Sequence, residues 1–148
     1  MSWALVQSLV SVQKEFGAAR GALFYADQHW PQVSDDIHLT GVSYGQVVIV
    51  LSRVEQTYLT RLFSEFEGML RTYLNSRSEV VPSKAFDLVN KVAKRQRANV
   101  PDDKRDAVHR VREYRNAIVH TPGSGAAGVS FRQALSALNQ YLVSLPDP

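Results

Sequence analysis

The feature that most constrains the fold of this chain is a run of apolar residues that keeps the period of an α-helix from Tyr44 to about Ser76. At 3.6 residues per turn the run covers about nine turns, and an apolar stripe of that length needs other helices to pack against it. The run therefore predicts a long helix in a helical bundle. The positions that keep the period are Val47, Val50, Leu51, Val54, Tyr58, Leu62, Phe66, Met69 and Tyr73.

A second long helix is expected near the N-terminus, over residues 2 to 27. Its apolar residues alternate at spacings of four and three, which is typical of a narrow seam on a long helix, and Ser2 can be its N-cap. Residues 28 to 43 are interpreted as a connection because they include Pro31 and Gly41. Such length often marks a functional or partner-covering segment. The seam consists of Leu5, Leu9, Val12, Phe16, Ala19, Leu23 and Ala26.

Three shorter helices are expected in the rest of the chain. Pro82 can occupy the first turn of a third helix that reaches about Ala98. Asp102 or Asp103 can cap a fourth helix, and Ser130 can cap a fifth. The apolar face of the third helix is expected to consist of Phe86, Val89 and Ala93.

The sequence predicts an all-α fold, a bundle of about five helices, because no segment shows the alternation of a strand and no internal repeat is present. A length of 148 residues fits a single domain. Within it, residues 1 to 42 form the N-terminal helix and its connection, and residues 43 to 145 form the core.

Composition and missing motifs exclude several function classes. The chain has no cysteine, which excludes thiolate metal sites, cysteine nucleophiles and disulfides. It has no G-x-x-x-x-G-K-S/T loop and no G-x-S-x-G elbow. Asp35, Asp36 and His38 lack a further ligand at suitable spacing, so we expect no metal and no cofactor. The longest apolar run, Val47 to Leu51, is too short to span a bilayer, and the N-terminus lacks the basic region of a signal peptide. We expect a cytoplasmic protein without a membrane partner.

The charge of the chain is unevenly distributed. The formal net charge is +3, but residues 81 to 115 hold ten Lys or Arg against five Asp or Glu. Such a segment can attract a polyanion by counterion release, or its side chains can simply solvate two surface helices, and both interpretations stay open. The basic residues selected as polyanion contacts are Lys91, Lys94, Arg95, Arg97 and Arg112.

The segment Arg112 to His120, REYRNAIVH, places an arginine, an amide and an imidazole in the last turns of the fourth helix. Arg115 can hold a phosphate through its planar donors, His120 can transfer protons near neutral pH, and Asn116 can orient either group. At about 100° per residue, Arg115 and His120 point about 140° apart, whereas Asn116 and His120 share a face. Either the helix loosens near His120 or a second copy of the chain supplies the missing group.

The motif residues are expected on a polar stripe opposite the apolar face of this helix, with Arg115 at the border. Glu67 has two possible uses: an exposed pair with Arg71, which is favoured, or a contact that holds Arg112 or Arg115. His109 is interpreted as a solvated residue rather than a second base. The expected polar stripe comprises His109, Arg112, Glu113, Asn116 and His120, and the apolar face comprises Ala107, Val111, Tyr114 and Ile118.

The hexapeptide Arg115–His120 matches an R-x4-H pattern with a polar residue directly after the arginine, and it resembles the motif of HEPN (higher eukaryotes and prokaryotes nucleotide-binding) domains. The all-helical pattern and the segment RLFSEFEGMLR, Arg61 to Arg71, strengthen the resemblance, which covers residues 43 to 145. It implies a metal-independent endoribonuclease of a toxin-antitoxin or antiviral defence system. In such a homodimer two motifs face each other, and the 2′-hydroxyl of the RNA is the nucleophile. The implied catalytic residues are Arg115, Asn116 and His120, with the basic residues above binding RNA and Glu67 in support.

Some HEPN toxins carry a tyrosine two places after the histidine, which their nucleotidyltransferase antitoxin modifies. Here that position is Pro122, so this control is not available, and the identity of any antitoxin partner stays open. Two alternatives share the same sequence features. One is a non-catalytic HEPN-like domain that binds RNA or nucleotide, or only dimerises. The other is a helical adaptor whose N-terminal seam docks another protein.

Overall fold

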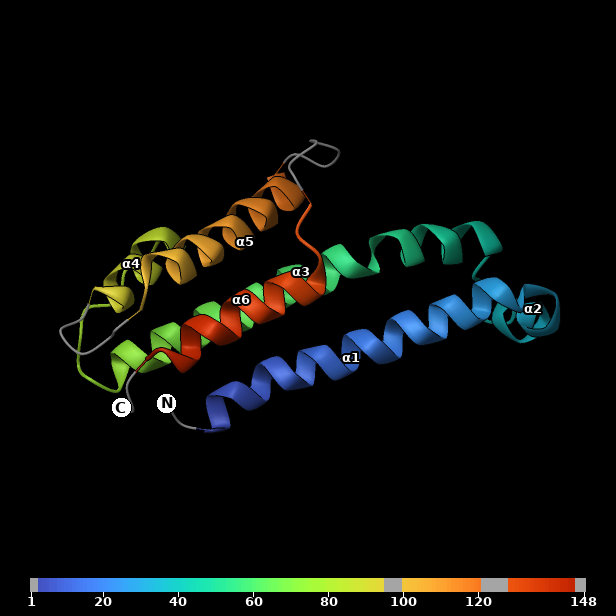
Figure 1. Cartoon of the computed structure of the whole chain (residues 1–148). Helices are drawn as coiled ribbons and strands as arrows, with labels where there is room; N and C mark the ends of the chain where they lie inside the picture. Colours follow the sequence, from blue (N-terminus) through green and yellow to red (C-terminus); the bar gives the residue numbers. More distant parts are fainter. Residues whose placement is uncertain (1–2, 95–99, 121–127, 146–148) are drawn as a thin grey trace.

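The computed structural model describes residues 3–94, 100–120 and 128–145, and over these residues the chain forms six helices and no strand (Figure 1). The predicted all-α fold is confirmed. The number of helices exceeds the expected five because the connection between the two long helices contains a helix of its own. The helices are α1 (Trp3–Gln28), α2 (Trp30–His38), α3 (Tyr44–Asn75), α4 (Ala85–Ala93), α5 (Asp102–His120) and α6 (Phe131–Val143).

The short helix α2 corrects the interpretation of residues 28 to 43 as a plain connection. Pro31 lies in the first turn of α2, where its missing N–H and its fixed φ are compatible with a helix. None of the residues of α2 is buried. α2 contacts α3 through two aromatic side chains: the centre of the Trp30 ring lies 5.2 Å from that of Tyr44 at the start of α3.

Two helices begin with the same capping arrangement. The Ser43 hydroxyl oxygen accepts a hydrogen bond from the Gln46 backbone N–H, and the Gln46 side-chain oxygen accepts one from the Ser43 backbone N–H. Ser130 and Gln133 form the same capping box at α6. Ser130 was predicted in this role. α5 begins at Asp102, so this carboxylate lies in the first turn of the helix rather than before it, where it still favours the helix dipole.

The third predicted helix is shorter than expected. α4 covers Ala85–Ala93, and residues 95–99 lie outside the described part of the chain. Pro82 precedes the helix instead of opening it. Arg71 holds the segment before the helix against α3, because its guanidinium donates to the carbonyl oxygens of Pro82 at 2.8 Å and Ser83 at 3.0 Å.

The hydrophobic core surrounds the C-terminal half of α3, which packs against α1, α4, α5 and α6. Six α3 side chains are fully buried there: Leu59, Leu62, Phe63, Phe66, Leu70 and Leu74. The N-terminal seam contributes Leu9 and Val12 from α1 to the same core. The other helices contribute Leu88, Val89, Val92, Val108, Val111, Phe131, Ala134, Leu138, Tyr141 and Leu142.

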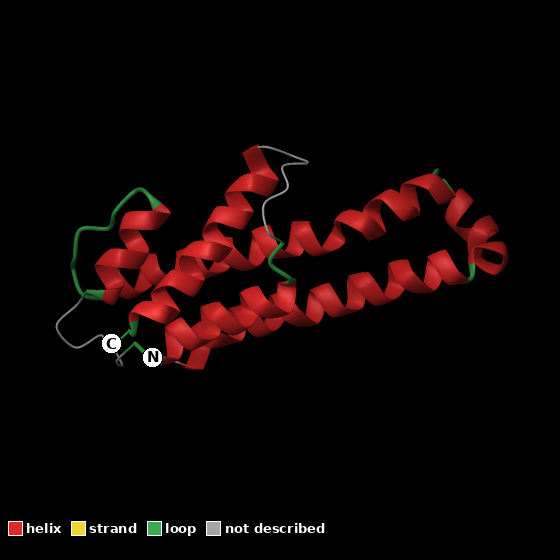
Figure 2. Ribbon diagram, turned by 45° about the horizontal axis from the view of Figure 1, so that its top comes forward, coloured by secondary structure: helices red, strands yellow, loops and turns green. Residues whose placement is uncertain are grey.

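The other halves of α1 and α3 extend beyond this core and are joined by α2 at their far end (Figure 2). We call residues 17–53 the distal hairpin. Between Val12 and Val54 only Val47 is buried among the described residues. Leu23 and Ala26 of the predicted seam are half-buried, so the seam is closed only near the core.

Candidate functional site

The helix that carries the motif, α5, packs against α3, α4 and α6. Its buried residues are Val108 and Val111. The line of closest packing therefore runs between the predicted apolar and polar faces. As a result Arg112 and Arg115, whose side chains are only 15% and 20% exposed, point into the bundle. The expectation that Arg112 belongs to a solvated stripe is wrong.

Arg115 is held at the interface of α5 with α3. Its Nη2 donates a 2.7 Å hydrogen bond to Oε2 of Glu67, and its guanidinium carbon lies 5.0 Å from the centre of the Phe63 ring. Glu67 is itself 18% exposed. Its second oxygen lies 3.7 Å from Arg71. Glu67 therefore contacts both predicted partners, but it is not the exposed pair with Arg71 that was favoured, and its bond to Arg115 is the closer one.

Asn116 and His120 follow Arg112 along one side of α5. They stand four and eight residues after it, so the three share a face of the helix. Asn116 is half-buried, and His120, the last residue of α5, is exposed. α5 stays helical through His120, so the first of the two alternatives, a helix that loosens before this residue, does not occur. Within one chain Arg115 faces α3 while His120 lies exposed at the helix end, and the structure does not bring the two together.

The basic residues selected as polyanion contacts are in different environments. Lys94, at the C-cap of α4, is exposed. Lys91 is half-buried and donates a 2.6 Å hydrogen bond to the carbonyl oxygen of Val80. Arg112 donates to Glu113 at 3.1 Å. Arg95 and Arg97 lie outside the described residues, as does Pro122.

His109 is not the solvated residue that was expected. Its ring packs 4.7 Å from the Phe86 ring of α4, and its Nε2 lies 3.2 Å from the side-chain oxygen of Asn90. Burial lowers the pKa of His109, and the nearby charges of Arg112 and Arg105 lower it further. The imidazole is therefore neutral at physiological pH and belongs to the contact between α4 and α5.

Phe86 is the residue of this region that the sequence interpretation misplaced. It was expected on the apolar face of the third helix, but its side chain is 48% exposed. The buried face of α4 consists of Leu88, Val89, Val92 and Ala93, and at 100° per residue Phe86 falls about 90° from the centre of this face. A helical wheel that included Leu88 and Val92 would have placed Phe86 at the edge of the apolar face.

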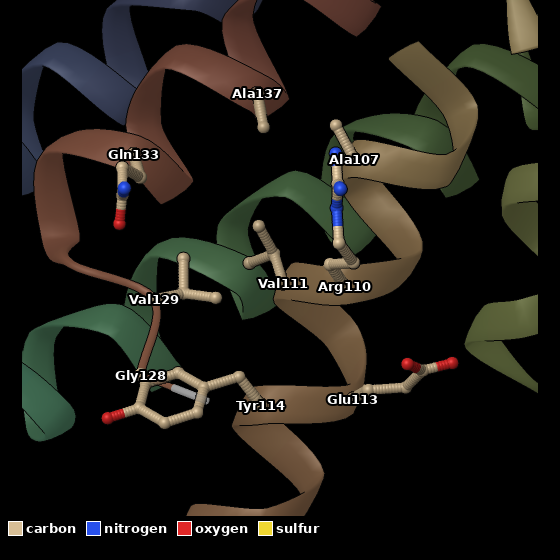
Figure 3. A pocket seen from close by; sticks show the side chains of 9 residues that line it. All are labelled: Ala107, Arg110, Val111, Glu113, Tyr114, Gly128, Val129, Gln133 and Ala137. Carbon is tan, nitrogen blue, oxygen red and sulfur yellow. The ribbon is translucent and has the colours of Figure 1, made fainter. Parts of the chain in front are cut away.

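A hollow of about 570 Å³ lies on the other side of α5, between α5 and α6 (Figure 3). Val111 and Tyr114 form its wall on α5, and the charged side chains of Arg110 and Glu113 stand beside it. Neither Arg115 nor His120 lines this hollow. The sequence did not predict it because it depends on how two helices from separate segments pack.

In residues 3–94, 100–120 and 128–145, no three His, Asp or Glu side chains gather closely enough to hold a metal ion. None of the helices in this part of the chain combines the length and the apolar character needed to cross a bilayer.

No protein-family model, no curated protein and no solved structure matches this chain. The resemblance to HEPN domains therefore depends on the motif residues and their surroundings.

Proposed function

We propose that this chain is a HEPN-type, metal-independent endoribonuclease of a toxin-antitoxin or antiviral defence system, acting as a homodimer in the cytoplasm. The observation that carries the proposal is the arrangement of the R-x4-H residues on α5. An exposed imidazole ends the helix at His120, a half-buried amide stands one turn before it at Asn116, and a guanidinium fixed by Glu67 lies on a neighbouring side of the same helix at Arg115.

A dimer would complete this arrangement. Because α5 is helical to its end and turns Arg115 toward α3, a single chain keeps the arginine apart from the histidine. A two-fold axis beside the ends of two α5 helices would place the His120 of one chain near the Arg115 of the other. An antitoxin would inhibit the enzyme by covering the site between the two helix ends.

In the proposed reaction His120 takes the proton of a ribose 2′-hydroxyl, or donates one to the leaving 5′-oxygen. The 2′-oxygen attacks the adjacent phosphorus, the bond to the 5′-oxygen breaks, and the product ends in a 2′,3′-cyclic phosphate. Arg115 would stabilise the negative charge that develops on the phosphate, and Asn116 would position the imidazole or a phosphate oxygen. The contact with Glu67 supports Arg115 by fixing the plane of its guanidinium.

RNA would be captured by the basic segment beside the motif. Lys94 is exposed at the end of α4, and Lys91 and Arg112 stand nearer the interface of α4 with α5. With Arg95 and Arg97 they would contribute mainly phosphate contacts, which raise affinity without reading sequence.

A non-catalytic RNA-binding or dimerisation module is the second candidate, and one observation favours it. The 2.7 Å bond between Arg115 and Glu67 neutralises the guanidinium that the enzyme would need for the phosphate. A structural role for Arg115 would be satisfied by this bond alone. The adaptor alternative has its own support in the aromatic side chains Phe24 and Tyr25, which are more than half exposed on α1.

Cleavage of mixed single-stranded RNA by the wild type and by His120→Ala separates the enzyme from the module. We expect the variant to cleave at least about a hundredfold more slowly, because a lost general acid or base costs that much. Cleavage should persist in excess chelator. His38→Ala, at the end of α2, is the matched control and should cleave like the wild type. Equal cleavage by wild type and His120→Ala, both folded, would overturn the catalytic proposal.

A further inference from the structure

The most unusual exposed side chain near the motif is Phe86, in the first turn of α4. Nearly half of its surface is open to solvent, at 48%. Its surroundings are polar: Ser83, Lys84 and Asp87 are all exposed. The exposed apolar surface is therefore a single ring with a polar rim, too small to dock a helix of another protein.

The ring of Phe86 is supported from α5. The imidazole of His109 lies 4.7 Å from its centre, and the guanidinium carbon of Arg112 lies 4.8 Å from it. His109 and Arg112 are three residues apart on the same side of α5, so both meet the ring from that helix. Nearly half of the ring surface stays open although both groups contact it. An aromatic ring that is held in place and still exposed can accept a flat partner at little entropic cost.

The same side of α5 leads from this ring to the motif. Arg112, Asn116 and His120 follow each other at intervals of four residues, and eight residues of α-helix span about 12 Å. Stacked nucleotides rise about 3.4 Å each along a strand, so this span corresponds to about four nucleotides at most. One short stretch of RNA could contact Phe86 and the motif together.

We propose that the exposed face of Phe86, supported by His109 and Arg112, is a stacking surface for an unpaired RNA base close to the cleavage site. The inference rests on the proposed function, because it assumes that RNA lies along this side of α5. Unpaired bases stack on aromatic side chains largely independently of sequence. Lys84, exposed two residues before Phe86, and Arg112, packed on the ring, supply positive charge next to this surface. The site would therefore select single-stranded over paired RNA.

The test measures equilibrium binding of a fluorescent single-stranded RNA that is 2′-O-methylated throughout and so lacks the nucleophile. Phe86→Leu keeps an apolar side chain of similar size but removes the ring, and we expect binding to weaken about tenfold. Phe86→Trp should bind at least as tightly as the wild type and gain tryptophan fluorescence that is quenched by RNA. Phe24→Leu is the matched control, since Phe24 is similarly exposed, at 58%, but lies on α1 in the distal hairpin.

A second measurement separates stacking from damage to the fold. When the bases of the probe are replaced by abasic sites, the affinity of the wild type should fall toward that of Phe86→Leu, and the variant should lose little more. If Phe86→Leu binds and cleaves RNA like the wild type, the stacking surface is wrong while the proposed enzyme stands. If the wild type neither binds nor cleaves RNA, the proposed function fails, and the stacking proposal fails with it.

Discussion

Among single residues, His109 has the best-defined electrostatic setting. It is packed between Phe86 and Asn90, and burial is the main cause of its lowered pKa, with Arg112 and Arg105 adding to it. The carboxylates of Asp106 and Glu113 act in the opposite direction but do not reverse the shift. A proton on this imidazole is therefore bound more weakly in the folded protein than in the unfolded chain.

This shift predicts how the stability of the protein depends on pH. As the pH falls through about 6.5, the ordinary pKa of histidine, the unfolded chain takes up a proton at residue 109 while the folded protein resists it. The stabilisation from neutral His109 is thus present above pH 6.5 and is lost as the pH falls toward the lower folded-state pKa. Urea unfolding at pH 7.5 and pH 5.5 should show a smaller loss of unfolding free energy for His109→Gln than for the wild type.

The control for this prediction is His38→Gln, because His38 is exposed on α2. It should keep the wild-type dependence on pH. An identical loss of unfolding free energy in the wild type and in His109→Gln would show that His109 titrates alike in the folded and unfolded states.

For single residues, the sequence predicted the relative placement of the motif side chains on their helix better than it predicted which side chains are buried. The spacing of Arg115, Asn116 and His120 correctly indicated that one helix keeps the arginine and the histidine apart. The burial of Arg112 and His109 could not be predicted, because it depends on α4 lying against α5. A guanidinium at the edge of an apolar face is solvated or packed according to its neighbour from another part of the chain.

At the scale of elements, α3 is one continuous helix with two different surroundings. Its C-terminal half has buried side chains such as Leu62 and Phe66, while Val48, Ile49 and Val50 in the distal hairpin are 41–52% exposed. Backbone hydrogen bonds are similar along a helix, so the difference in protection must come from tertiary packing.

Hydrogen exchange should therefore divide α3 into two parts. We expect the amides of residues 50 to 53 to exchange at least about tenfold faster than those of residues 62 to 70, because local opening of the distal hairpin exposes little buried apolar surface. The comparison within one helix is its own control. Equal protection along α3 would show that another molecule, or a second copy of this chain, covers the distal hairpin in solution.

Periodicity predicted the two long helices almost to their ends but failed in the short elements. α3 was expected from Tyr44 to about Ser76 and ends at Asn75. α2 was missed because Pro31 was interpreted as a break, although proline in a first turn is compatible with a helix. Nine residues give too few turns for an apolar period to stand out, and α2 buries none of them.

At the scale of the whole molecule, the number of chains in the particle directly tests the proposed site. Because Arg115 and His120 are separated within one chain, we expect a dimer, with a mass by light scattering twice that of the 16.6 kDa chain at micromolar concentration. Mixing inactive Arg115→Ala with inactive His120→Ala should restore cleavage, since a mixed dimer keeps one intact pair across the axis. A monomer that cleaves RNA would rule out the composite site.

The distal hairpin also determines how the molecule moves through solution. The 32 residues of α3 extend about 48 Å. A spherical chain of 148 residues, with a radius of gyration of about 15 Å, would be only about 38 Å across. A single chain is therefore rod-like, experiences more friction than a sphere of equal mass, and leaves a gel-filtration column early. Its elution volume alone would suggest a larger particle, and only a method that weighs the particle directly distinguishes one rod from two.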